Sequence, residues 1–109
     1  MTDWVSIGRV EDIPSLGARV LRTVKGDIAV FRTAKDEIFA MWDSCPHKGG
    51  PLSQGIVHDR RVTCPLHNWV MDLSTGTAVG PDQGCTATFP VRVEDGQVMI
   101  SFAKKKVLA

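Results

Sequence analysis

Short runs of alternating apolar and polar residues recur along the chain, and turn residues separate them. No long segment keeps the spacing of an amphipathic helix, whereas two-residue alternation is typical of half-buried strands. The runs predict strands at residues 4–7, 18–22, 28–32, 37–42, 87–94 and 97–102. Turns are predicted at residues 25–27 and 34–36 and at Asp95-Gly96. The pattern therefore predicts an all-β fold.

Charge and hydropathy narrow the class of protein. The 13 basic and 12 acidic side chains nearly cancel, so no net field favours nucleic acid or an anionic membrane as a partner. The first residues lack a basic region followed by an apolar stretch, and no apolar run approaches the ~18 residues of a membrane span. We expect a cytoplasmic protein whose partner is another protein. The three cysteines, Cys45, Cys64 and Cys85, cannot all pair within the chain, which favours a reducing compartment.

Two short segments each pair a cysteine with a histidine. They are Cys45-Pro46-His47 and Cys64-Pro65-Leu66-His67, with 16 residues between them. A [2Fe-2S] cluster with two thiolates on one iron and two imidazoles on the other, the Rieske centre, needs this set of ligands. We predict that Cys45, His47, Cys64 and His67 bind such a cluster from two converging loop tips. The chain would then be an electron carrier without catalytic residues, and His47 and His67 would face the partner.

The composition around these segments predicts how the chain is organised. Residues 43 to about 85 are rich in glycine and proline, as expected where loops wrap a compact inorganic ligand. We interpret them as a cluster-binding subdomain of two ligand loops, inserted in a β-sandwich or small barrel. The base would comprise residues 1–42 and 86–103, and residues 104–109 would form a basic tail. Residues 1–109 are thus expected to form one domain.

Two other uses of this residue set fit the spacing less well. Zinc fingers usually place two cysteines on one knuckle and two histidines on a helix, unlike the arrangement here. A nucleophilic Cys/His pair would not explain why the pattern occurs twice. A zinc-bound or metal-free interaction module stays open as an alternative of another class.

Residues beside the ligands are expected to shape the site. Pro46 and Pro65 would stiffen the loops, while glycines after His47 would let backbone N–H groups approach the cluster sulfurs and raise the potential. Apolar neighbours would shield the cluster from water. The residues assigned to this surrounding layer are Pro46, Gly49, Gly50, Pro51, Leu52, Leu66 and Trp69.

Other conspicuous residues receive structural interpretations. The third histidine, His58, falls where a hairpin turn is expected and is interpreted as a surface turn residue. Cys85 is interpreted as a small, partly buried apolar residue. The tryptophans are expected to pack in the core or under loops, with a border of the docking surface as the alternative for Trp69. They are Trp4, Trp42 and Trp69.

The two ligand boxes, Cys45-Pro46-His47-Lys48-Gly49-Gly50-Pro51-Leu52 and Cys64-Pro65-Leu66-His67, resemble those of Rieske-type ferredoxins, and the likeness covers nearly the whole chain. Three further segments are similar to the small subunit of assimilatory NAD(P)H-dependent nitrite reductase. They are Asn68-Trp69, Asp72-Leu73-Ser74-Thr75-Gly76 and Gly80-Pro81-Asp82-Gln83-Gly84-Cys85. Ring-hydroxylase ferredoxins tend instead to follow the last ligand with glycines.

The chain departs from the high-potential Rieske proteins of respiratory complexes. Those proteins place extra cysteines at positions matching Gly50 and Leu66, so their loop-bridging disulfide is not expected here. They also carry a serine and a tyrosine, donors to the cluster, where this chain has Trp69 and Met71. The resemblance therefore implies a potential toward the lower end of the Rieske range of about −150 to +300 mV.

The resemblance also implies a reaction and a partner. In nitrate assimilation, nitrite is reduced to ammonia with electrons from NADH or NADPH on a large subunit that bears flavin, an iron-sulfur cluster and sirohaem. This chain has no Gly-x-Gly-x-x-Gly fingerprint, so it would relay electrons or help organise the holoenzyme and would not be catalytic alone. The alternative is a Rieske ferredoxin of an aromatic-ring-hydroxylating dioxygenase, with an oxygenase and a ferredoxin reductase as partners.

Overall fold

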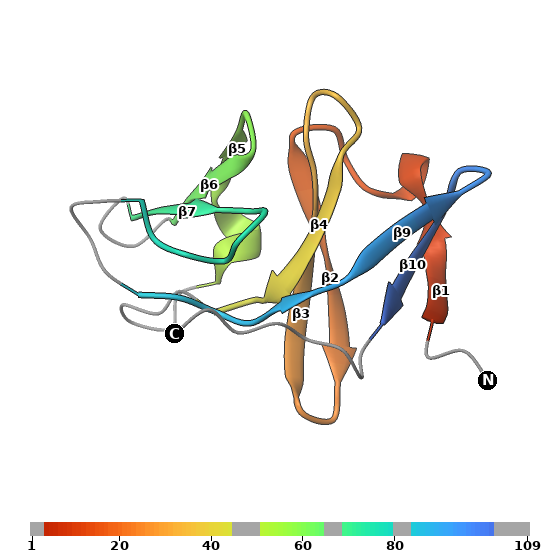
Figure 1. Ribbon diagram of the computed structural model, residues 1–109, viewed down its shortest axis with the longest axis horizontal. Coiled ribbons are helices and arrows are strands. Elements are labelled where there is room, and N and C mark those ends of the chain that lie inside the picture. Colours follow the sequence, from red (N-terminus) through yellow and green to blue (C-terminus); the bar gives the residue numbers. More distant parts are fainter. Residues whose placement is uncertain (1–3, 45–50, 65–68, 80–83, 102–109) are drawn as a thin grey trace.

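The computed structural model describes residues 4–44, 51–64, 69–79 and 84–101. Within these ranges the regular elements are strands and two short 3-10 turns, which confirms the predicted all-β class (Figure 1). The elements are β1 (Trp4–Arg9), η1 (Val10–Asp12), β2 (Gly17–Thr23), β3 (Gly26–Arg32), β4 (Ile38–Trp42), η2 (Leu52–Gln54), β5 (Ile56–His58), β6 (Arg61–Thr63), β7 (Val70–Asp72), β8 (Thr88–Phe89), β9 (Val91–Glu94) and β10 (Gln97–Ser101). None of the helical turns in these ranges is long and apolar enough to cross a membrane.

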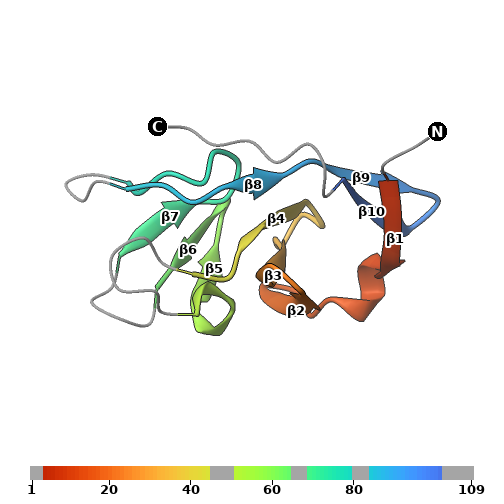
Figure 2. The ribbon, with the colours of Figure 1, turned by 90° about the horizontal axis from the view of Figure 1, so that it is seen from below.

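The strands form three antiparallel sheets. Their strand orders are β1-β10-β9, β2-β3-β4-β8 and β5-β6-β7. Figures 1 and 2 show the β5-β6-β7 sheet at one end of the molecule, the sheet containing β3 in the middle, and β1, β9 and β10 at the other end. The small β5-β6-β7 sheet falls inside the range predicted for the cluster-binding insertion. The boundaries between base and insertion stay a prediction.

Strand β3 has an apolar core on each of its faces. Side chains alternate between the two faces of a strand, so a strand that is covered on both sides needs a continuous apolar run. Ala29 and Phe31 belong to the buried cluster shared with the β5-β6-β7 sheet. Ile28 and Val30 belong to a second buried cluster, shared with β10. This double burial explains why residues 28–31 are all apolar.

The structure corrects the predicted strand at residues 87–94. Pro90 interrupts it, because proline has no N–H to donate to a sheet. Before Pro90, β8 pairs with β4, and after it β9 pairs with β10, so the chain passes here from one sheet to another. Two smaller differences concern where strands begin and end. Strand β1 continues past a shift in its pairing register between Ser6 and Gly8 and ends at Arg9, and β3 begins at Gly26, inside the predicted turn.

Candidate metal centre

The predicted ligands divide between described and undescribed parts of the chain. Cys64 is described, whereas Cys45, His47 and His67 lie outside the described residues. Of the surrounding layer, Pro51, Leu52 and Trp69 are described, and Pro46, Gly49, Gly50 and Leu66 are not. The ligand set itself therefore stays a prediction, and the structure shows how the chain on either side of it is held.

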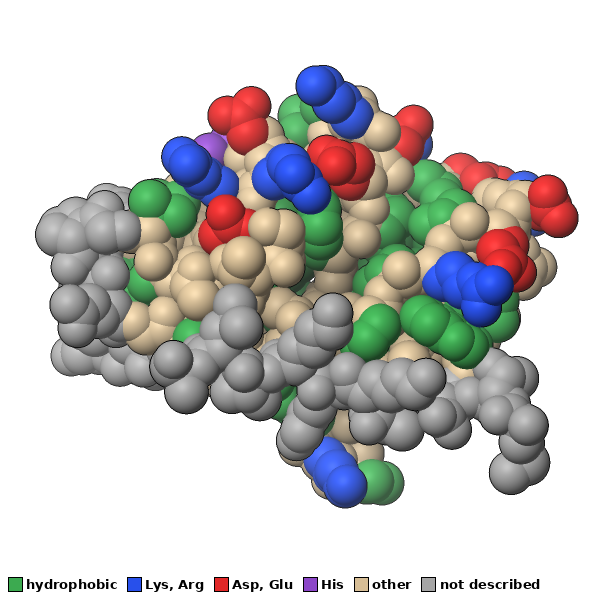
Figure 3. All heavy atoms as spheres, in the orientation of Figure 1, with side chains coloured by type: hydrophobic (Ala, Val, Ile, Leu, Met, Phe, Trp, Pro, Cys, Tyr) green, Lys and Arg blue, Asp and Glu red, His purple; other side chains and the backbone are tan. Residues whose placement is uncertain are grey.

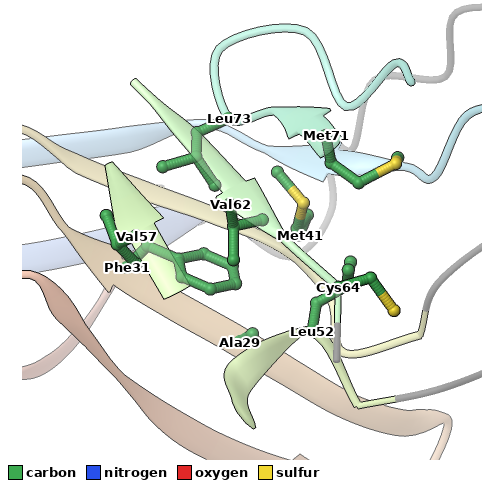
Figure 4. Close-up of a cluster of buried hydrophobic side chains, with 9 residues drawn as sticks. All are labelled: Ala29, Phe31, Met41, Leu52, Val57, Val62, Cys64, Met71 and Leu73. Atoms are coloured by element: carbon green, nitrogen blue, oxygen red, sulfur yellow. The ribbon is translucent and has the colours of Figure 1, made fainter. Parts of the chain in front are cut away.

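Cys64 follows directly after β6 and is fully buried, with 0% of its surface exposed. It packs in the cluster of buried side chains that joins the middle sheet to the β5-β6-β7 sheet. The other members are Ala29, Phe31, Met41, Leu52, Val57, Val62, Met71 and Leu73. In Figure 4 the Cys64 side chain lies at one edge of this cluster, and its sulfur points away from Phe31. A soft sulfur donor thus lies at the edge of an apolar core, a setting that suits a thiolate ligand.

The second ligand segment is closed at its base by a hairpin. The backbone N–H of Cys64 donates to the carbonyl oxygen of Trp69 at 2.6 Å. This bond continues the pairing of β6 with β7, in which Thr63 lies opposite Val70. Trp69 is partly buried and packs against the same core as Cys64, which confirms its predicted packing role. Cys64 and Trp69 are therefore held to each other by a backbone hydrogen bond and by packing in the same core.

The first ligand segment is also closed at its base. The carboxylate of Asp43 accepts two hydrogen bonds from Ser53, one from the backbone N–H and one from the hydroxyl, each at 2.7 Å. Leu52, which directly precedes Ser53 in the sequence, has 0% of its surface exposed and packs in the same buried cluster as Cys64. The bases of the two segments thus meet at one patch of the core, as two loops that share one cluster require.

Sequence reasoning missed the Asp43–Ser53 pair. The sequence offers an aspartate two residues before Cys45 and a serine two residues after Pro51, but no local motif links them, because they are ten residues apart. Pro51 is exposed and precedes η2, while Leu52 points into the core. Whether either covers the cluster stays a prediction.

The structure corrects the interpretation of His58. It is the last residue of β5 rather than a turn residue, and its Nε2 lies 2.7 Å from the hydroxyl of Thr63 on β6. The turn itself is made by Asp59 and Arg60, and Asp59 has a φ of 51°. No group of three His, Cys, Asp or Glu side chains suited to a metal occurs within the described ranges, so His58 has no metal-binding partners there.

The remaining interpretations agree with the structure. Cys85 is partly buried and forms an isolated bridge with Thr77. Trp42 makes an edge contact with Phe89, with ring centroids 5.1 Å apart. The guanidinium of Arg92 lies over the ring of Trp4, 5.5 Å from its centroid. Cys85 and these tryptophans therefore serve packing.

Electrostatics near the β5-β6-β7 sheet centre on the turn that follows β7. Burial raises the pKa of Asp72, but hydrogen bonds from the Ser74 hydroxyl and from the N–H groups of Ser74 and Thr75 outweigh burial and hold the pKa below its ordinary value. The positive charge of Arg61 acts in the same direction. On the face shown in Figure 3, acidic and basic side chains alternate, and neither sign gathers into a large patch.

Comparison with known proteins matches residues 3–101 to the Rieske-like [2Fe-2S] domain family. The anthranilate 1,2-dioxygenase ferredoxin subunit of Burkholderia cepacia is 34% identical over 102 residues, covering 93% of this chain and 94% of the relative. A chain from the complex of reduced oxygenase and oxidized ferredoxin in carbazole 1,9a-dioxygenase superposes with a TM-score of 0.84 at 24% identity, covering 99% of this chain and 100% of that one, and shows the shared fold. A solved structure described as a nitrite reductase NADPH small subunit superposes with a TM-score of 0.80 at 25% identity, covering 92% of this chain and 98% of that one.

Proposed function

The chain belongs to the family of Rieske-like [2Fe-2S] domains, and within this family we propose that it is the small subunit of an NAD(P)H-dependent nitrite reductase. It is a Rieske electron-transfer protein that carries a [2Fe-2S] cluster. When bound, such a cluster takes up one electron and releases it to a partner. The partner in this proposal is a cytoplasmic large subunit with flavin and sirohaem, where nitrite is reduced to ammonia.

In this proposal the chain holds the cluster through Cys45, His47, Cys64 and His67. The observation that supports it is the placement of Cys64, fully buried at the core edge where the bases of both segments meet. The apolar residues around Cys64 would exclude water from the thiolate side. Met71 occupies, as a fully buried apolar side chain, the position where the high-potential branch has a donor, which supports a potential in the lower part of the Rieske range.

The nitrite reductase assignment rests on the segments that distinguish this chain from ring-hydroxylase ferredoxins. The described part of one of them, residues 84–85, lies beside the residues that directly follow another, the 72–76 segment. Thr77, just after Gly76, bridges to Cys85, and the N–H of Ala78 donates to the carbonyl oxygen of Gly84 at 2.8 Å. Residues 84–85 therefore lie beside residues 77–78, which directly follow the 72–76 segment, and this region is the one suited to a subfamily-specific contact. Similarity to the nitrite reductase small subunit structure over 98% of its length supports the same assignment.

A ferredoxin of an aromatic-ring-hydroxylating dioxygenase is the second candidate. The 34% identity to a dioxygenase ferredoxin subunit over 94% of that protein favours it. The metal site would be the same, and the partners would be an oxygenase and a ferredoxin reductase. The two candidates therefore share the cluster and differ in the partner and in the surface that the partner contacts.

The ligand set is tested with two pairs of matched variants. We expect Cys64→Ser and His67→Ala to abolish the Rieske-type EPR signal of the reduced protein, together with its bound iron and sulfide. Cys85→Ser and His58→Ala change the same residue types outside the ligand segments and should keep the signal. An unchanged signal in Cys64→Ser would contradict the ligand assignment, and a colourless parent prepared anaerobically with ample iron would contradict the cluster itself.

The partner is tested by reconstitution. The holoprotein is mixed with a sirohaem nitrite reductase large subunit, or with a ring-hydroxylating oxygenase and its reductase, and NAD(P)H oxidation is followed with the respective substrate. We expect stimulation of nitrite reduction and stable complex formation only with the sirohaem protein. Electron delivery to the oxygenase alone would overturn the proposal in favour of the second candidate.

A further inference from the structure

The 3-10 turn η2 lies between the two ligand segments and touches the base of each. On one side Ser53, in the middle of η2, donates its N–H and its hydroxyl to the Asp43 carboxylate, each at 2.7 Å. Asp43 is itself fixed, because its backbone N–H donates to the carbonyl oxygen of Asp27 on β3 at 2.8 Å. The Asp43–Ser53 pair thus ties η2 to the middle sheet across the base of the first ligand segment.

On its other side η2 lies against β6, the strand that leads to Cys64. Gly55 caps η2 by donating its N–H to the carbonyl oxygen of Leu52 at 2.9 Å. A Cβ at Gly55 would come within 2.9 Å of the Val62 side chain and closer still to the carbonyl oxygen of Thr63, so the two backbones are in close approach. Leu52 adds a side-chain contact by sharing the buried cluster with Cys64.

We propose that Asp43 and Ser53 are positioning residues, whose hydrogen bonds hold η2 in place and thereby set the position of the first ligand segment relative to the second. The inference rests on the proposed ligand set. The pair fixes both the backbone and the side chain of Ser53, and Asp43 brings a charged acceptor, which makes both bonds stronger than neutral ones.

A second aspartate–serine pair, Asp72 and Ser74, provides a control. It lies at the end of the β5-β6-β7 sheet that is far from Cys64. The Asp72 carboxylate accepts the N–H of Ser74 at 2.8 Å and also its hydroxyl. Asp72 pairs with Arg61, whereas Cys64 follows the opposite end of β6. Ser74→Ala therefore removes a hydroxyl to carboxylate bond from the β5-β6-β7 sheet without touching the base of either ligand segment.

The test compares holoprotein variants Ser53→Ala, Ser53→Thr and Ser74→Ala with the parent. All three leave the formal charge unchanged, so a change in the cluster cannot come from an added or lost charge. The rate of loss of the visible absorption is followed well below the unfolding temperature, the EPR line widths of the reduced protein are recorded, and thermal unfolding of each variant is measured. We expect Ser53→Ala to lose the cluster roughly tenfold faster than the parent and to broaden the EPR lines, as removal of a charge-assisted hydrogen bond implies.

Ser53→Thr retains a hydroxyl and should restore cluster retention to within about twofold of the parent, and Ser74→Ala should do the same even where it lowers the unfolding temperature. Equal rates of cluster loss in Ser53→Ala and Ser74→Ala, or unbroadened EPR lines in Ser53→Ala, would overturn the positioning role and leave the ligand assignment intact. A parent without a Rieske signal would instead refute the proposed function, and the positioning role would fall with it.

Discussion

Replacement of Gly55 by alanine tests whether the close approach of η2 to β6 stabilises the protein. Gly55 has φ −80° and ψ 178°, a conformation open to any residue, so alanine adds no backbone strain. The added Cβ would instead lie 2.9 Å from the Val62 Cγ2 and 3.1 Å from the Leu52 carbonyl oxygen, with the Thr63 carbonyl oxygen nearer than either. Two of these three obstacles are backbone atoms, which cannot rotate away.

The cost follows from the displacement that relieves this crowding. Ordinary contact begins near 3.4 Å, so Val62 must retreat by about 0.5 Å and Thr63 by more. Overpacking of this kind costs about 1–3 kcal/mol, and the smaller entropy of the unfolded alanine chain offsets about 0.4–1 kcal/mol. We expect a net loss of about 1–2 kcal/mol. For a chain of 109 residues this lowers the Tm by roughly 4–8 °C.

Thermal unfolding followed by circular dichroism, at fixed pH and scan rate, measures the shift. Gln54→Ala is the control, because Gln54 lies in the same 3-10 turn with an exposed side chain, and its Tm should stay within about 1–2 °C of the parent. Because η2 would move away from β6, Gly55→Ala should also lose the cluster faster. A Gly55→Ala protein that melts with the parent would refute the reasoning, since it would mean that η2 and β6 separate without cost.

Three polar side chains give further predictions. The Ser101 hydroxyl is buried without a hydrogen-bond partner among the described residues, so Ser101→Ala should leave the free energy of unfolding within about 0.5 kcal/mol of the parent or raise it. Thr33→Ala should instead lower the free energy of unfolding by about 1–2 kcal/mol, because the buried Thr33 hydroxyl accepts the Glu37 N–H at 3.1 Å. Urea unfolding of both variants distinguishes these outcomes. Asp72 has a folded pKa below its ordinary value of 3.8, so its carboxylate contributes stability that is complete above pH 3.8 and is lost as the pH falls through the folded pKa. The urea midpoint of Asp72→Asn should therefore lie below that of the parent near pH 6, and the gap should close only as the pH falls below 3.8 through the folded pKa; a gap that stays constant with pH would contradict the assignment.

Much of the fold could be predicted from the sequence because strand signals are local. Two-residue alternation identifies strands such as β2 and β10 wherever one face meets the core. The continuous run at residues 28–31 differs in pattern, and the structure accounts for it by placing an apolar core on each face of β3. The ligand set is likewise a prediction from the sequence, since Cys64 and the other three residues were proposed from chemistry and spacing alone.

Other features required the tertiary structure. Pro90 was visible in the sequence, yet its effect, which is to divide one predicted strand between two sheets, depends on β4 and β10 being the neighbours on either side. The Asp43–Ser53 pair joins residues separated by the whole first ligand segment. No local pattern identifies Ser53 as the partner of Asp43, because another serine, Ser44, lies directly beside Asp43 in the sequence and yet Ser53 makes the bonds.

The sequence by itself determined the class of fold, the family and the residue types that the metal chemistry needs, because periodicity and donor chemistry are carried by neighbouring residues. Only the tertiary structure decided where Cys64 is buried, how η2 contacts the bases of the two ligand segments, and why Gly55 has no room for a side chain. These features depend on which distant backbones come into contact. Such contacts arise from packing of the whole chain, and local patterns do not specify them.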